Sequence, residues 1–162
     1  MIPKLKDFFI SYTSADKNWA EWIAWQLEDV GYQVVIQAWD FRPGGNFVLD
    51  MQKAAAGSDR TIAVLSPDFL KSLYTQPEWA AAFANDPTGE KSSLLPVRVH
   101  DCELEGLLGQ IVYVDLVGLS ESDAVDALLK GIQIGRVKPP RKPNFPGVSG
   151  RSTPSSPPFP NP

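Results

Sequence analysis

The stretch Asp7-Phe8-Phe9-Ile10-Ser11-Tyr12 decides the fold, because it is an aromatic and β-branched run without helical spacing. A short apolar run that stops at polar residues is typical of a buried strand in a parallel sheet. Ser14 is expected to cap the helix that follows, whose apolar residues recur at helical spacing until Gly31 ends it. The segment is therefore predicted to be the first strand and helix of an α/β domain.

The rest of the chain repeats this alternation of strand and helix. Strands are predicted over 33–37, 61–65, 94–99 and 111–115, and helices over 47–56 and 121–134. A broken helical region is predicted over about 68–84, with a discontinuity near Pro77. Ser120 is expected to cap the last helix, and residues 39–46 carry the proline and glycines of a loop. The predicted fold is a flavodoxin-like doubly wound sheet of five mostly parallel strands with helices on both faces, which binds ligands beyond the carboxyl ends of its strands.

Proline usage divides the 162 residues into a domain and a tail. Nine of the fifteen prolines follow Lys138, in a segment too poor in apolar residues to build a core. We therefore expect a folded domain over 1–136 and a disordered linker or tail over 137–162. A ligand for SH3-type domains is the alternative interpretation of this tail.

Composition excludes several classes of function. The net charge of −4 and the lack of any Lys/Arg run argue against nucleic acid as a partner. With Cys102 as the single cysteine and His100 as the single histidine, neither an internal disulfide nor a Cys/His zinc site is expected. The start of the chain lacks the pattern of a signal peptide, and no apolar run is long enough to span a bilayer. The expected location is the cytoplasm, with no membrane partner and no metal.

Four motifs, in order and at the proper spacing, resemble those of the TIR (Toll/interleukin-1 receptor) domain. They are Asp7–Tyr12 followed by Ser14-Ala15-Asp16; Trp39–Phe47, similar to the BB loop of the family; Val64–Ser72, similar to its strand ending L-S-P; and Ser72–Glu78, which keeps the spacing of the pattern S-x-W-C-x-x-E. Tyr74 and Thr75 depart from the usual Trp and Cys of the last motif. The resemblance covers about residues 5–134.

The resemblance implies that Glu78 is a catalytic carboxylate, because this glutamate is catalytic in family members that consume NAD+. Nicotinamide leaves NAD+ as a neutral molecule, so no acid has to protonate it, and one carboxylate that stabilises the cationic ribose is enough. NAD+ is then the substrate, and no cofactor is expected. Read without the family, Glu78 is an acid in the first turn of a helix after Pro77, where the helix dipole favours a carboxylate.

Residues around two loops are predicted to bind NAD+. Ser11, Tyr12 and Thr13 follow the first strand, Asp40, Arg42 and Gly44 lie in a mobile loop, and Tyr74 or Trp39 is expected to pack on nicotinamide. Arg42 is a candidate for a phosphate or for a neighbouring subunit. Gly44-Gly45 lacks the following Lys and Ser/Thr of a phosphate-binding loop. For Ser14 and Asp16, ligand binding and helix capping are equally open.

Two functions remain in competition. The first is an NAD+ glycohydrolase or cyclase, activated by self-association with other TIR domains, as the N-terminal effector part of a prokaryotic immune or signalling protein in antiviral defence, fused to a C-terminal oligomerisation or sensor domain. The alternative is a non-catalytic TIR–TIR adaptor. A phosphoacceptor of the response-regulator type is excluded, because Ser11-Tyr12 and Ser66-Pro67 stand where it needs acids.

Overall fold

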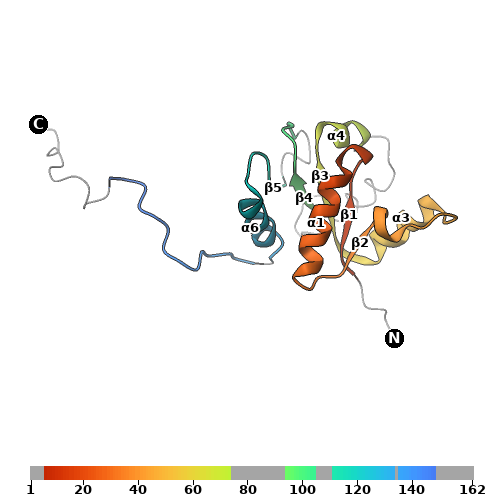
Figure 1. Ribbon diagram of the computed structural model, residues 1–162, viewed down its shortest axis with the longest axis horizontal. Helices are drawn as coiled ribbons and strands as arrows, with labels where there is room; N and C mark the ends of the chain where they lie inside the picture. The colour runs from red at the N-terminus through yellow and green to blue at the C-terminus, as the bar shows by residue number, and fades with distance from the viewer. Residues whose placement is uncertain (1–5, 74–93, 105–110, 134, 149–162) are drawn as a thin grey trace, which may run out of the picture.

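The sheet has the strand order β2-β1-β3-β4-β5, and every neighbouring pair is parallel. The computed structural model describes residues 6–73, 94–104, 111–133 and 135–148 (Figure 1). The strands are β1 (Lys6–Ser11), β2 (Val34–Ile36), β3 (Ser58–Leu65), β4 (Leu94–Arg98) and β5 (Val114–Asp115). The chain reverses its winding direction between β1 and β3, which confirms the flavodoxin-like fold class.

Helices cover both faces of the sheet (Figure 1). They are the 3₁₀ turn η1 (Ser14–Asp16), α1 (Lys17–Asp29), α2 (Gln37–Asp40), α3 (Phe47–Ala56), α4 (Pro67–Leu73) and α6 (Glu121–Gly131). Side chains alternate across β1, so Phe8 and Ile10 join the core under α1 and α6, whereas Phe9 packs against Met51 and Ala54 of α3. A third cluster places Phe69 of α4 on β3 and β4.

Two helix ends are as the sequence predicts. Gly31 follows α1 with a φ of 102°, a left-handed conformation that glycine adopts without strain. Ser120 caps α6, because its side chain accepts a hydrogen bond from the backbone N–H of Asp123. At the start of α1 the prediction is wrong, since Ser14 lies inside η1 and Asp16 occupies the cap position without a side-chain capping bond.

The loop predicted over 39–46 is partly wrong. Trp39 and Asp40 belong to α2, a single helical turn that begins directly after β2. The Asp40 carboxylate accepts a hydrogen bond from the backbone N–H of Ile36 at 2.8 Å and so closes this turn on itself. The proline and the two glycines form the turn only from residue 43 onward, between α2 and α3.

The last strand is shorter than predicted, and Pro96 explains why. Val97 and Arg98 of β4 pair with Val114 and Asp115, so continuing the pairing backwards would set Tyr113 opposite Pro96. Proline has no N–H to donate to a ladder. Ile111, Val112 and Tyr113 therefore remain outside the sheet, and Val112 is 88% exposed.

The described part of the tail, residues 135–148, contains no helix or strand and is exposed. It runs away from the domain beyond α6 (Figure 1). The domain boundary near residue 136 remains a prediction. Among the described residues no helix combines the length and the apolar character that crossing a bilayer requires.

Candidate functional site

A pocket of about 580 Å³ opens at the carboxyl ends of β1 and β2. Its volume lies in the range that small-molecule and cofactor sites occupy. Its walls combine hydroxyl groups, aromatic rings, one amide, one ammonium group and aliphatic side chains. The lining residues are Tyr12, Thr13, Ser14, Lys17, Gln37, Ala38, Phe41, Phe47, Met51 and Ser72. The pocket thus lies beyond the carboxyl ends of the strands, where doubly wound sheets bind their ligands.

Tyr12 forms part of the wall next to α2. Burial raises the pKa of its phenol, while a hydrogen bond with the backbone of Ala38 acts in the opposite direction. The phenol is therefore neutral at physiological pH and retains a proton that it can donate to a ligand oxygen.

Asp16 links the segments that follow three strands, and one of its partners, Thr13, lines the pocket. The side chain is 2% exposed, and one carboxylate oxygen accepts hydrogen bonds from Thr13 Oγ1 at 3.1 Å and from Ser66 Oγ. Ser66 Oγ in turn accepts from the backbone N–H of Phe69, at the start of α4. The other oxygen of Asp16 lies 3.4 Å from Nε2 of His100, which follows β4. Asp16 therefore holds the Thr13 loop against the loop that begins α4.

The structure brings only some of the predicted binding residues to the pocket. Tyr12 and Thr13 line it, whereas Ser11 is buried at the end of β1 and is not part of the wall. Trp39 packs on the main core and donates from Nε1 to Glu21 Oε2 at 2.8 Å. Arg42 and Gly44 are exposed and outside the lining.

Glu78 and Tyr74 lie outside the described residues, so the catalytic and stacking roles proposed for them remain predictions. Ser72, which lines the pocket, is the first residue of the motif that ends at Glu78. Its hydroxyl donates to the carbonyl oxygen of Phe69 at 2.9 Å.

Several residues of the wall were not predicted from the sequence. Lys17 is the only charged side chain among the described residues of the lining, and Phe41 and Phe47 form an edge-to-face pair with ring centroids 6.1 Å apart. The signal for Lys17 was its position at the first residue of a helix after a strand-end loop. Phe41 and Phe47 flank the Pro/Gly turn, and only the fold shows that both face the pocket.

No group of three or more His, Cys, Asp or Glu side chains suited to a metal ion occurs within the described residues. Burial raises the pKa of the Cys102 thiol. A thiol with a raised pKa is a poor nucleophile and a poor ligand at neutral pH. The functional groups on the described wall of the pocket are hydroxyl groups, aromatic rings, the Gln37 amide and the Lys17 ammonium group.

Comparison with known proteins identifies the family. The model of the TIR domain family matches residues 8–129. The chain belongs to the TIR domain family. It is 31% identical over 98 residues to the Protein toll of Drosophila melanogaster. This match covers 59% of the chain and 9% of toll, so the chain matches less than a tenth of the length of that relative.

Solved structures show the same fold. A metazoan TIR-STING receptor from C. gigas, in complex with 2',3'-cGAMP, superposes with a TM-score of 0.64 at 25% identity, over 79% of this chain and 40% of that one. The TIR domain of the Toll-related receptor TRR-2 from Hydra magnipapillata gives 0.59 at 23% identity, over 78% and 94%. At 23% identity the second likeness shows the fold alone.

TIR domains generally self-associate or bind other TIR domains, and the family serves signal transduction and includes members that cleave NAD+. The predicted family is thereby confirmed for this chain. Its assignment to the prokaryotic NAD+-consuming type, and its place at the N-terminus of a larger protein, remain predictions.

Proposed function

We propose that this TIR domain hydrolyses NAD+ to nicotinamide and ADP-ribose. The observation that carries the proposal is the pocket beyond β1 and β2, whose wall includes the first residue of the Ser72–Glu78 motif. In the reaction the bond between the ribose anomeric carbon and the nicotinamide nitrogen breaks, and its electron pair leaves with neutral nicotinamide. Water adds to the cationic ribose and loses a proton. Attack by the adenine of the same molecule instead of water gives a cyclic product.

In this proposal each part of the substrate has a partner on the chain. Glu78 stabilises the positive charge that develops on the ribose, and the hydroxyl groups of Tyr12 and Thr13 hydrogen-bond to sugar oxygens. Lys17 pairs with the pyrophosphate, at the first residue of α1, where the helix dipole also favours an anion. Phe41 and Phe47 supply aromatic faces for a flat ring.

Self-association is proposed to complete the site. Phe47, Val48 and Leu49 at the start of α3 are 51%, 63% and 46% exposed, and Phe47 also lines the pocket. Adjacent exposed apolar side chains are typical of surfaces that bind another protein. A second TIR domain on this patch would order the wall of the pocket from outside.

The wider context is part of the proposal. The proline-rich residues 137–162 fit a linker to a C-terminal oligomerisation or sensor domain, with the TIR domain as a cytoplasmic effector in prokaryotic antiviral defence. A non-catalytic adaptor is the second candidate, and the exposed patch on α3 favours it equally. Only chemistry at Glu78 separates the two.

The test is chromatography of NAD+ after incubation with concentrated protein. We expect free nicotinamide with the natural chain and at least about 10²-fold less with Glu78→Gln, because the carboxylate acts mainly on the transition state. Glu103→Gln is the matched control, since Glu103 is exposed and outside the pocket. Intact NAD+ after incubation with the natural chain at every concentration would favour the adaptor.

A further inference from the structure

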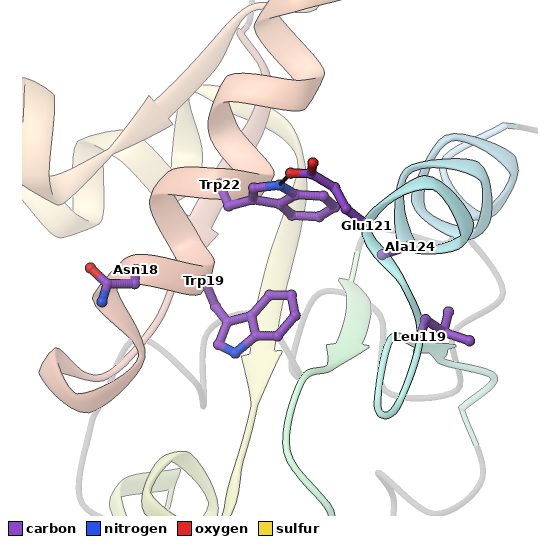
Figure 2. Close-up of a pocket in the computed structure, with 6 residues that line it drawn as sticks. All are labelled: Asn18, Trp19, Trp22, Leu119, Glu121 and Ala124. Carbon is purple, nitrogen blue, oxygen red and sulfur yellow. Dashed lines mark hydrogen bonds between the residues drawn. The ribbon is translucent and has the colours of Figure 1, made fainter.

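A second cavity, of about 330 Å³, separates α1 from the start of α6 (Figure 2). It is lined by Asn18, Trp19, Trp22, Leu119, Glu121 and Ala124. This α1/α6 groove takes no part in the site proposed for NAD+, which lies at β1 and β2. Its polar and apolar groups suit an extended, proline-rich and basic peptide, as the following observations show.

Two tryptophans make the apolar wall of the groove. Their rings meet edge to face, with centroids 5.9 Å apart and an interplanar angle of 82°. Figure 2 shows the Trp19 ring pointing into the space between α1 and the segment that carries Leu119, whose side chain is 42% exposed. Trp19 Nε1 donates no hydrogen bond to any described residue and so remains available to a carbonyl oxygen.

Glu121 supplies a negative charge at the same place. One of its carboxylate oxygens accepts a hydrogen bond from Trp22 Nε1 at 3.0 Å, as Figure 2 shows, and the side chain is exposed. A carboxylate has lone pairs for several donors, so Glu121 can hold Trp22 in place and also bind a cation. The groove thus combines aromatic faces, a free N–H donor and an acid.

The tail of this chain has the complementary chemistry. A polyproline II helix repeats every three residues. This period places Pro140, Pro143 and Pro146 on one edge, and Lys138 and Arg141 on the adjacent edge. Aromatic-lined grooves bind such proline edges, because the extended helix is already formed and its carbonyl oxygens point outward.

Charge favours the same pairing over the whole chain. Residues 135–162 carry five Lys or Arg and no acid, whereas residues 1–134 carry ten Lys or Arg and nineteen Asp or Glu. The net charge is therefore +5 on the tail and −9 on the rest. A cation of the tail is attracted to Glu121 and to the acidic domain around it.

We propose that the α1/α6 groove binds residues 138–146 of a second copy of this chain. The occupant comes from another copy because residues 135–148 leave the carboxyl end of α6 and extend away from the domain (Figure 1). The groove, in contrast, is lined by residues at the start of α6. The proline edge packs on Trp19 and Leu119, and Arg141 pairs with Glu121. Each copy offers one groove and one tail, so the contact is head to tail and can extend from copy to copy.

The direct test is a titration of the ¹⁵N-labelled full chain with a synthetic peptide of residues 136–148, followed by the tryptophan indole N–H signals in NMR spectra. We expect the signals of Trp19 and Trp22 to shift and saturate, with those of Trp25 and Trp39 as internal controls. A peptide with serine in place of Pro140, Pro143 and Pro146 should bind at least about 10-fold more weakly. Equal binding of both peptides, or no shift at Trp19 and Trp22, would overturn the proposal.

The second arm measures self-association of the full chain by sedimentation. The triple variant Pro140→Ser, Pro143→Ser and Pro146→Ser should associate less than the natural chain, and Pro139→Ser, which changes a proline off the edge, should not. The substituted residues are exposed, so folding is not at issue. Unchanged association of the triple variant would overturn the proposal, as would an effect on the indole signals that is independent of concentration, because that indicates binding within one chain. Neither arm depends on NAD+ cleavage.

Discussion

At the scale of single residues, Asp16 is the most heavily used side chain near the candidate site. Its carboxylate is buried and is bonded to groups from the loops after β1, β3 and β4. From the sequence alone Asp16 could either cap a helix or bind a ligand, because its partners Ser66 and His100 are distant in sequence. In the structure Asp16 holds these loops together and is not one of the residues that line the pocket.

Asp16→Ala should lower the free energy of unfolding by about 2–4 kcal/mol, because the hydroxyl groups of Thr13 and Ser66 lose their buried acceptor. Asp16→Asn should lose less, since the amide oxygen still accepts one of these bonds. Urea denaturation measures both. Asp59→Ala is the control, at an exposed position of β3. A loss below about 0.5 kcal/mol for Asp16→Ala would contradict this role in holding the loops together.

Lys17 is predicted to determine substrate affinity if the pocket holds NAD+. Lys17→Glu should raise KM about 10-fold or more with a smaller change in kcat, because the pyrophosphate is equally charged in the ground and transition states. Steady-state NAD+ cleavage measures the two constants. Lys53→Glu on α3 is the control, and Arg42→Glu tests the residue first predicted for this contact. An effect of Arg42→Glu alone would move the phosphate site to the loop before α3.

At the scale of elements, most of the fold could be predicted from pattern. The helix predicted over 47–56 has the observed bounds of α3, because Asn46 caps it through a bond from the Leu49 N–H and apolar residues recur along it. The short α2 could not be predicted, since it lies directly before a Pro/Gly turn and is stabilised by bonds that the pattern does not reveal, from Ile36 N–H to Asp40 and from Trp39 to Glu21. Part of the pocket wall could be predicted, because Tyr12 and Thr13 follow a strand. Phe47 could not, because only the packing of its helix brings it to the pocket.

The ion pair between Arg98 of β4 and Asp115 of β5 is expected to make the stability of the fold depend on pH. Arg98 binds Asp115 through Nη2 at 2.8 Å and Nε at 3.2 Å, and the hydrogen bond from the guanidinium lowers the pKa of Asp115 below its usual 3.8. A carboxyl whose pKa is lower in the folded state stabilises the fold above its unfolded pKa and loses this contribution as pH falls through the folded value. The pair is partly exposed and screened, so its contribution is modest.

Asp115→Asn removes this contribution, so the stability difference between the natural chain and the variant measures it. The stability difference between the natural chain and the variant should be constant at neutral pH and should shrink toward zero below about pH 3.8. Denaturant unfolding between pH 7 and pH 2 measures the difference. Asp126→Asn, which removes an exposed pair with Lys130 within α6, is the matched control. A difference that grows as the pH falls would show that the sign is wrong.

At the scale of the whole molecule, NAD+ cleavage should rise more steeply than linearly with protein concentration. The patch of Phe47, Val48 and Leu49 lies beside the pocket, and a neighbour that orders it increases the fraction of competent sites. Initial rates per molecule, with and without tethering to a surface through a tag, measure this. Val48→Ser should flatten the dependence, with Val112→Ser as an exposed control far along the chain. Constant specific activity throughout would mean that one chain holds a complete site.

The tail is predicted to add little to the stability of a single molecule. In dilute solution, deletion of residues 138–162 should shift the Tm by less than about 5 °C, which corresponds to roughly 1 kcal/mol for a domain of this size. The described part of the tail is exposed and free of regular structure, so little apolar surface is lost with it. Thermal unfolding followed by circular dichroism measures the shift. A larger decrease in Tm would show that the tail packs against the domain of its own chain.

Pro96 also affects the tendency of the protein to aggregate at high local concentration. Among the described residues no strand pairs with Leu94 to Pro96 on the side of β5, and an open strand edge is a template on which other molecules can grow a cross-β aggregate. Proline interrupts the row of N–H donors that such growth requires. If the domain acts by self-association, as proposed above, Pro96 protects it from aggregation under the conditions in which it is active. Pro96→Val is expected to aggregate more readily than the natural chain at high protein concentration.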